Sequence, residues 1–222
     1  MYQFNFQPVF ENLDVLLYGA WLTVRLSFLA MILGLVVSLL GAIAKTSAIR
    51  PLRWLVDVYV EVIRNTPFLI QIFFIFFGLP AVGISMSPNT AALVALVINV
   101  GAYGTEIIRA GIESIPRGQI EAGRALGLSP VNIFRYVVVV PALRNIYPAL
   151  TSQFIYLMLT SSVVSVISAN DLASAGADLN ARTFASFEIY LVLTVMYFLL
   201  ALGFSTLFGV IRRAFFTYPA SR

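Results

Sequence analysis

Residues 17–44 read LYGAWLTVRLSFLAMILGLVVSLLGAIA, an almost uninterrupted apolar stretch. A helix that crosses a bilayer needs about 20 consecutive apolar residues, and this stretch exceeds that length. The whole chain has the same character, because 60% of its 222 residues are hydrophobic, only 11% are charged and the mean hydropathy is +0.92. Soluble domains carry about 25% charged residues. The sequence therefore predicts an all-α integral membrane protein.

Four further segments have the length and hydropathy of membrane spans. Together with the first they predict five transmembrane helices: Leu17–Ala44, Leu52–Leu79, Ala91–Ile112, Val137–Ile167 and Phe187–Ile211. We also expect a short interfacial helix within residues 9–18 and a short helix in the loop of residues 169–186. No internal repeat or low-complexity tract divides the sequence. We expect a single transmembrane domain over residues 1–222, with its core at about residues 17–212.

Basic residues are concentrated in alternate connections, which predicts the orientation of the chain. The opposite connections contain acids and, among basic residues, only Arg182, with Arg25 near the end of the first span. The positive-inside rule places the N-terminus outside and the C-terminus in the cytoplasm. The net charge of +4 follows from this asymmetry, so no nucleic-acid partner is expected. The basic residues assigned to the cytoplasmic side are Lys45, Arg50, Arg53, Arg109, Arg117, Arg124, Arg135, Arg212, Arg213 and Arg222.

Several kinds of chemistry are missing from the sequence. Histidine and cysteine are absent, which removes the commonest metal ligands and the usual nucleophile–base pairs. The chain has no G-x-x-x-x-G-K-[ST] phosphate loop, so it does not bind ATP in that manner. We therefore expect no catalytic residue, no metal site and no cofactor in this chain.

A polar stretch, RGQIEAGRALGLSPVNIFR, fills residues 117–135 between two predicted spans. Pro116 suits a helix start, and Gly127 suits its end because glycine tolerates a positive φ. Ser129 and Pro130 then have the residue types of an N-cap and a first helical position. The loop predicts two short helices separated by a glycine. One interpretation is an ordinary amphipathic connector at the membrane surface.

The same stretch carries a more specific signal. Glu121-Ala122-Gly123 followed by Gly127 resembles the EAA loop of ATP-binding-cassette (ABC) importer permeases. The similarity extends over about residues 17–210. Within this range the chain most resembles the polar amino-acid (His/Gln/Arg-type) uptake subfamily. Gly123 replaces the usual second alanine, and Pro141-Ala142 stands where relatives have Pro-Gln. The stretches that carry the subfamily resemblance are YVEVIRNTPFLIQIFFIFFGLP (59–80), AYGTEIIRAGIESIPRGQIEA (102–122) and TSSVVSVISANDL (160–172).

The resemblance implies a type I ABC importer permease fold in the bacterial inner membrane. It implies that residues 113–135 form a cytoplasmic coupling loop whose 117–128 helix docks on an ATPase. Glu121 would offer an anionic contact, Ala122 and Gly123 would let the partner backbone approach, Leu126 would fill a pocket and Gly127 would set the exit angle of the chain.

The resemblance also implies partners. These are a pair of ABC ATPase subunits that bind ATP and Mg²⁺, a second permease subunit that is identical or homologous, an extracytoplasmic solute-binding protein and the lipid bilayer. The chain itself would be a non-catalytic permease subunit that moves a polar amino acid, or a related small solute such as an opine, into the cytoplasm. A stand-alone secondary transporter or channel is the alternative, although the odd number of spans and the lack of inverted repeats disfavour it.

Polar residues at membrane depth are costly and are therefore candidates for the substrate pathway. Pro67 is expected to break the second span and to free backbone carbonyls near residue 63. The competing interpretation is that such residues join neighbouring helices, with Arg64 paired to Glu61 or Glu106. Gly34, Ser38 and Gly41 fit close packing of the first span. The pathway candidates are Arg64, Asn65, Thr66, Gln71, Asn99, Tyr103, Glu106, Ser161 and Ser162.

Overall fold

The computed structural model describes residues 4–215, and within this range the chain is helical and contains no strand. The predicted all-α class is confirmed. Short π and 3-10 segments connect or distort several helices, notably at Phe74–Gly78, Leu79–Val82, Ile133–Val139 and Ser161–Ile167. The helices are α1 (Gln7–Glu11), α2 (Leu13–Thr46), α3 (Arg50–Arg64), α4 (Phe68–Phe73), α5 (Pro88–Glu113), α6 (Arg117–Ala125), α7 (Pro130–Asn132), α8 (Val140–Thr160), α9 (Leu172–Thr183) and α10 (Ser186–Phe215).

Four of the five predicted spans correspond to helices long and apolar enough to cross a membrane: Leu13–Thr46, Pro88–Glu113, Pro130–Ile167 and Ser186–Phe215. Each begins or ends a few residues beyond the predicted apolar run, because capping and polar residues continue the helix outside it. The remaining predicted span, residues 52–79, corresponds to a pair of helices broken at Pro67, as expected. α3 and the segment Phe68–Val82 are bent by 110°, because a proline disfavours the helical conformation in the residue before it.

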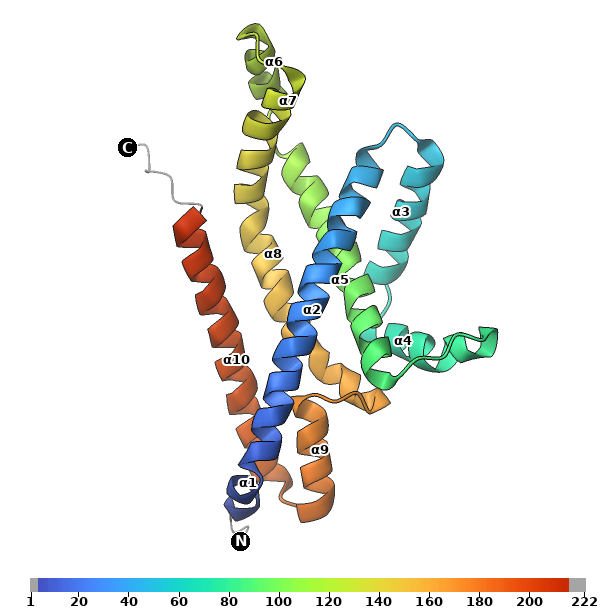
Figure 1. Cartoon of the computed structure of the whole chain (residues 1–222), viewed down its shortest axis with the longest axis vertical. Coiled ribbons are helices and arrows are strands. Elements are labelled where there is room, and N and C mark those ends of the chain that lie inside the picture. Colours follow the sequence, from blue (N-terminus) through green and yellow to red (C-terminus); the bar gives the residue numbers. More distant parts are fainter. Residues whose placement is uncertain (1–3, 216–222) are drawn as a thin grey trace.

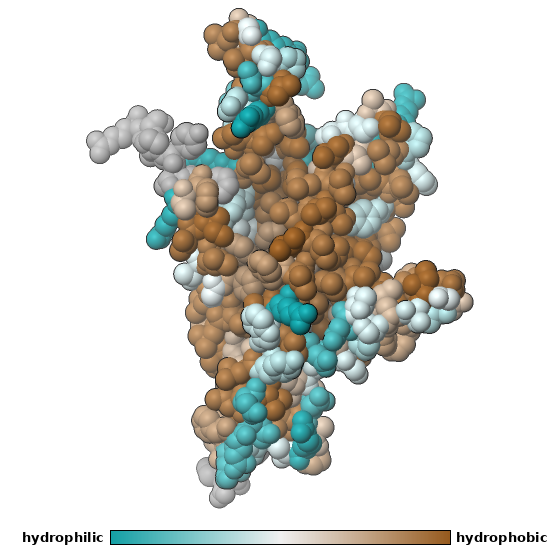
Figure 2. Space-filling view, viewed as in Figure 1, coloured by the Kyte–Doolittle hydropathy of each residue, from teal (hydrophilic) through white to brown (hydrophobic). Residues whose placement is uncertain are grey.

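The helices form an elongated bundle in which α2, α5 and α8 pack together, with α3 against α5 and α10 against α8 and α9 (Figure 1). The α2–α3 turn and the α6–α7 hairpin lie at one end, and α1 and α9 lie at the other. Apolar side chains cover the middle of the face shown in Figure 2, and hydrophilic residues gather toward the ends. The short helix expected in the loop of residues 169–186 is present as α9. The short helix before the first span, α1, covers Gln7–Glu11, and residues 13–18 belong to α2 instead.

Small residues set the contact between α2 and α5, as predicted for the first span. Ser38 is buried and its Oγ donates to the Gly34 carbonyl at 2.7 Å. A Cβ built on Gly34 would lie 2.6 Å from Val100 Cγ1, and one built on Gly104 would lie 2.1 Å from Ser38 Oγ. Neither distance leaves room for a side chain. The close approach of these two backbones therefore depends on glycine.

Replacing Gly104 by leucine is expected to destabilise the α2–α5 contact, because the added side chain has no space. Overpacking of a closed core typically costs about 1–3 kcal/mol. The cost is expected at the upper end of this range, because residue 104 has no space even for a Cβ. Gly203→Leu is a matched control, since a Cβ at Gly203 in α10 meets nothing within 4 Å. The midpoint of thermal unfolding in detergent should fall clearly for Gly104→Leu alone. Equal midpoints for the two variants would contradict this account of the packing.

Candidate functional site

The α6–α7 hairpin has the local structure that the sequence predicts. α6 begins directly after Pro116, and Gly127 has φ +73°. The Leu128 amide donates to the Gly123 carbonyl at 3.1 Å and the Gly127 amide to the Arg124 carbonyl at 2.9 Å. These two bonds form a Schellman motif, which closes the helix end. Ser129 caps α7 by accepting from the Asn132 amide at 3.3 Å.

The exposed surface of this hairpin differs in one respect from the expectation. Glu121, Ala122 and Leu126 are exposed, Leu126 by 80%. Gly123 is instead buried, and a Cβ there would lie 3.2 Å from Ile133 Cγ1 of the same chain. Gly123 therefore faces Ile133 of its own chain in this structure. It allows α6 to pack closely against the segment that follows α7.

Two apolar residues of the hairpin were not among the predicted site residues. Val131 is 72% exposed and Phe134 is 57% exposed. With Leu126 they place three large apolar side chains on the surface of a hairpin that extends from the bundle (Figure 1). Their i, i+3 spacing was visible in the sequence, but a helix that enters a membrane span is apolar anyway, so the signal was not distinctive.

The break at Pro67 forms a second site, and Gln71 stabilises it. The predicted release of carbonyls near residue 63 is confirmed, because the Ile63 carbonyl accepts from Gln71 Nε2 at 2.7 Å instead of from the helix. Gln71 Nε2 also donates to the Thr66 carbonyl at 3.0 Å and contacts Thr66 Oγ1 at 2.9 Å. Asn99 Nδ2 of α5 donates to Gln71 Oε1 at 3.1 Å. Both amides are buried, so they hold the break together and fasten it to α5.

Replacing Gln71 by leucine is expected to destabilise the protein, because the Ile63 and Thr66 carbonyls lose a buried donor. Each buried polar group left unsatisfied costs about 1–3 kcal/mol. Gln153→Leu in α8 is the matched control, since Gln153 Nε2 is buried with no hydrogen-bond partner within residues 4–215. The midpoint of thermal unfolding should fall for Gln71→Leu and stay close to the wild-type value for Gln153→Leu. A Gln71→Leu variant as stable as the control would disprove the bracing role of the amide.

A polar hollow of about 310 Å³ lies at the end of α3, just before the break. It is lined by Val60, Glu61, Arg64, Asn65 and Tyr103. The Arg64 Cζ lies 5.5 Å from the centre of the Tyr103 ring, within the range of a cation–π contact. Glu61 Oε2 accepts from Asn65 Nδ2 at 2.7 Å. Neither ion pair expected for Arg64 is present among the described residues. The hollow thus contains a cation, a carboxylate and an aromatic face.

Glu106 does not lie with these residues. It forms ion pairs with Lys45 of α2 and, at 2.9 Å, with Arg109 of its own helix. Lys45 also pairs with Asp57 of α3 at 2.9 Å, and Arg109 pairs with Glu113. The side chains of Lys45 and Glu106 are only 15% and 16% exposed. This network ties α2, α3 and α5 together, and Glu106 does not line the hollow beside Arg64.

The remaining pathway candidates bond to their own backbone. Ser161 Oγ donates to the Met158 carbonyl at 2.7 Å and Ser162 Oγ to the Leu159 carbonyl at 2.8 Å. Thr66 Oγ1 donates to the Val62 carbonyl at 2.7 Å. None of the three lines the hollow beside Arg64. The structure therefore brings together Arg64, Asn65 and Tyr103, and separately Thr66, Gln71 and Asn99.

Comparison with known sequences identifies relatives along nearly the whole chain. A family model described as a binding-protein-dependent transport system inner membrane component matches residues 21–217. The L-cystine transport system permease protein TcyB of Bacillus subtilis (strain 168) is 36% identical over 98% of this chain and 91% of its own length. The glutamine transport system permease protein GlnP of Escherichia coli (strain K12) is 36% identical over 91% of this chain and 94% of its own.

Solved structures give the same picture. The crystal structure of an amino acid ABC transporter with histidines matches with a TM-score of 0.89 and 37% identity, over 96% of this chain and 100% of that chain. An inward-facing structure of the MetNI methionine ABC transporter matches with a TM-score of 0.68 and 23% identity, over 90% of this chain and 97% of that chain. The second match supports similarity of fold alone.

Proposed function

This chain belongs to the family of binding-protein-dependent transport system inner membrane components, and on that basis we propose that it is the permease subunit of an ATP-driven importer of polar amino acids. The chain is a multi-pass membrane protein with the type I ABC permease fold.

The hollow beside the helix break indicates which class of substrate the protein binds. Arg64 is the last residue of α3, 14 residues beyond Arg50, and therefore about 21 Å along the helix at 1.5 Å per residue. A cation at membrane depth is costly, so a charged residue there is a candidate for the substrate pathway. Arg64 suits the carboxylate of an amino acid, while Glu61 suits its ammonium group. Relatives named for cystine, glutamine and arginine transport differ in substrate side chain but share this zwitterion.

The residues around the hollow would have separate roles. Arg64, Asn65 and Tyr103 would contact the substrate, and Thr66, Gln71 and Asn99 would hold the break that positions them. Ser161 and Ser162 would line the pathway at another stage of the transport cycle, when the 3-10 segment that contains them moves. Glu106 would hold α2 and α5 together through Lys45.

The exposed α6–α7 hairpin would be the coupling element. It lies at the end of the molecule that also contains the α2–α3 turn with Lys45 and Arg50, which the positive-inside rule assigns to the cytoplasm. A partner ATPase would bind ATP and Mg²⁺ and would receive Glu121, Ala122 and Leu126 in a groove. Gly127 would fix the angle at which the chain returns to the membrane, and the chain itself would catalyse no reaction.

An apolar arm supports the expectation of a second permease subunit. The segment from α4 to Val82 extends sideways from the bundle and exposes Phe74 by 66%, Phe77 by 63% and Val82 by 72%. A second, identical or homologous, chain would cover part of this surface and complete the pathway. The extracytoplasmic solute-binding protein would dock at the opposite end, on α1 and α9.

Reconstitution tests the proposal. Proteoliposomes that contain this chain and a co-purified ATPase, with the binding protein supplied outside, should accumulate radiolabelled glutamine or cystine only when ATP is enclosed. Liposomes that contain this chain alone should accumulate neither. Uptake by the chain alone, driven by an ion gradient, would identify a secondary transporter and contradict the proposal.

A further inference from the structure

Arg25 is a charge on the outer surface of the first span. It is the only charged residue between Asp14 and Lys45, and its side chain is exposed on α2. No ion pair joins it to any carboxylate of the part of the chain that the structure describes. An exposed arginine without an ion pair in its own chain is available to an anionic partner from outside the chain.

The spacing of Arg25 from Lys45 places it at a definite depth. The two residues are 20 positions apart on the continuous helix α2 (45 minus 25), which corresponds to about 30 Å at 1.5 Å per residue. This is about the thickness of the hydrocarbon core of a bilayer. With Lys45 in its ion network at one boundary, Arg25 lies at the boundary of the opposite leaflet, at the level of lipid phosphate groups.

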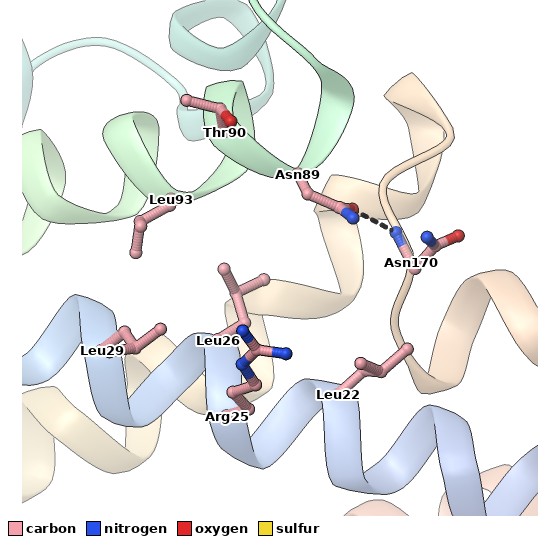
Figure 3. A pocket seen from close by; sticks show the side chains of 8 residues that line it. All are labelled: Leu22, Arg25, Leu26, Leu29, Asn89, Thr90, Leu93 and Asn170. Carbon is pink, nitrogen blue, oxygen red and sulfur yellow. Dashed lines mark hydrogen bonds between the residues drawn. The ribbon is translucent and has the colours of Figure 1, made fainter.

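The surroundings of Arg25 combine polar donors with apolar walls. Figure 3 shows its side chain in a cavity of about 230 Å³ between α2, the beginning of α5 and Asn170. Asn89 Oδ1 accepts from the Asn170 amide at 2.8 Å, which leaves Asn89 Nδ2 as a further donor. The rest of the cavity is lined mainly by Leu22, Leu26, Leu29 and Leu93. A second hollow of about 380 Å³ flanks Arg25 on the side of Trp21, Val24 and Phe28.

We propose that Arg25 and Asn89 bind the phosphate of an anionic phospholipid in the leaflet opposite Lys45, with its acyl chains in the two apolar hollows. The planar guanidinium donates two parallel hydrogen bonds to phosphate oxygens, which an ammonium group cannot match. The bound lipid connects α2, the start of α5 and the loop before α9. It stabilises the packing of these three elements against one another.

A lipid fits this position better than a protein partner. α2 continues for 12 residues beyond Arg25 to Leu13, and α9 packs against it there. A protein that docks from the outer side meets α1 and α9 first. On the membrane side of Arg25 the exposed residues of α2 are uniformly apolar and large, as expected where acyl chains cover a helix: Phe28, Leu29, Ile32, Leu33, Val36, Leu39, Leu40 and Ile43.

Native mass spectrometry of the complete transporter tests this site. The complex is delipidated and incubated with equal amounts of phosphatidylglycerol and phosphatidylethanolamine. The wild type should retain phosphatidylglycerol in preference, and Arg25→Gln should bind it about tenfold more weakly, because a charge-assisted hydrogen bond is lost. Arg25→Lys should fall between the two. Arg182→Gln, which removes an exposed arginine from α9 at the same end, is the matched control and should bind as the wild type does.

The thermal stability of the protein in nanodiscs provides a second measurement. The wild type should unfold at a higher temperature in nanodiscs that contain phosphatidylglycerol than in phosphatidylethanolamine alone, and Arg25→Gln should lose this difference. Equal retention of phosphatidylglycerol by wild type and Arg25→Gln would overturn the proposal. So would displacement of the lipid by inorganic phosphate, which indicates a free-anion site, or dissociation of the complex by Arg25→Gln, which indicates a subunit interface.

Discussion

Replacing Ala122 by proline is expected to abolish ATP-driven uptake and to leave the protein inserted and folded. Ala122 lies inside α6 and is exposed, so the change disturbs no core packing. Proline removes the amide donor of residue 122, and its ring clashes with the preceding turn, at a cost of about 3 kcal/mol in a helix interior. α6 has only nine residues and packs mainly against the segment Ile133–Val139. It therefore has little other support with which to keep its shape.

Uptake and ATP hydrolysis by the reconstituted complex measure this effect together. We expect uptake to fall at least tenfold and the stimulation of ATP hydrolysis by substrate-loaded binding protein to disappear. Glu121→Lys should act in the same direction, because it reverses the charge offered to the ATPase without breaking the helix.

Arg117→Pro is the matched control for the proline itself. Position 117 is the first residue of α6, where the amide has no helical partner, and Pro116 already has the extended ψ of 133° that a following proline requires. Arg117→Ala reports the loss of the charge alone. Normal coupled transport by Ala122→Pro would exclude α6 as the coupling element.

The parts of this structure that depend on neighbouring residues could be predicted from the sequence. Gly127 ends α6 with a positive φ, and Ser129 and Pro130 begin α7, because caps are determined within one turn of helix. The break at Pro67 was predictable for the same reason. The apolar runs gave the positions of four spans, since bilayer thickness fixes their length.

The partners of the polar residues could not be predicted in this way. Lys45 and Glu106 are 61 residues apart, and their pairing depends on how closely α2 approaches α5. That approach depends on contacts between glycines and small residues whose mutual register the sequence does not specify. The same holds for Arg64, which contacts Tyr103 instead of an acid. It also holds for Gly123, which lies against Ile133 because of the angle at which the chain returns after Gly127. Gln71, which braces the break at Pro67, likewise accepts from Asn99 of α5, which lies 28 residues away in the sequence.

Replacing Arg64 by glutamine is expected to reduce transport at least tenfold when substrate-loaded binding protein is saturating. The change removes the cation proposed to hold the substrate carboxylate, and a hydrogen bond to a charged group contributes about 1.5–3 kcal/mol, or roughly 10–100-fold in affinity. Because the binding protein determines the apparent affinity of uptake, the maximal rate is the relevant quantity. Equilibrium dialysis of labelled substrate against the purified complex without binding protein should show the loss of affinity directly.

The folded state should tolerate this change, and that separates a substrate contact from a structural one. Arg64 is exposed and forms no ion pair among the described residues, so its replacement leaves no buried charge without a partner. The midpoint of thermal unfolding should therefore stay near that of Arg50→Gln, a control at the opposite end of α3. Arg64→Lys should recover part of the transport rate, since it keeps the charge but loses the planar donors. If Arg64→Gln unfolds at a lower temperature but transports normally per folded molecule, Arg64 contributes to helix packing instead of binding the substrate.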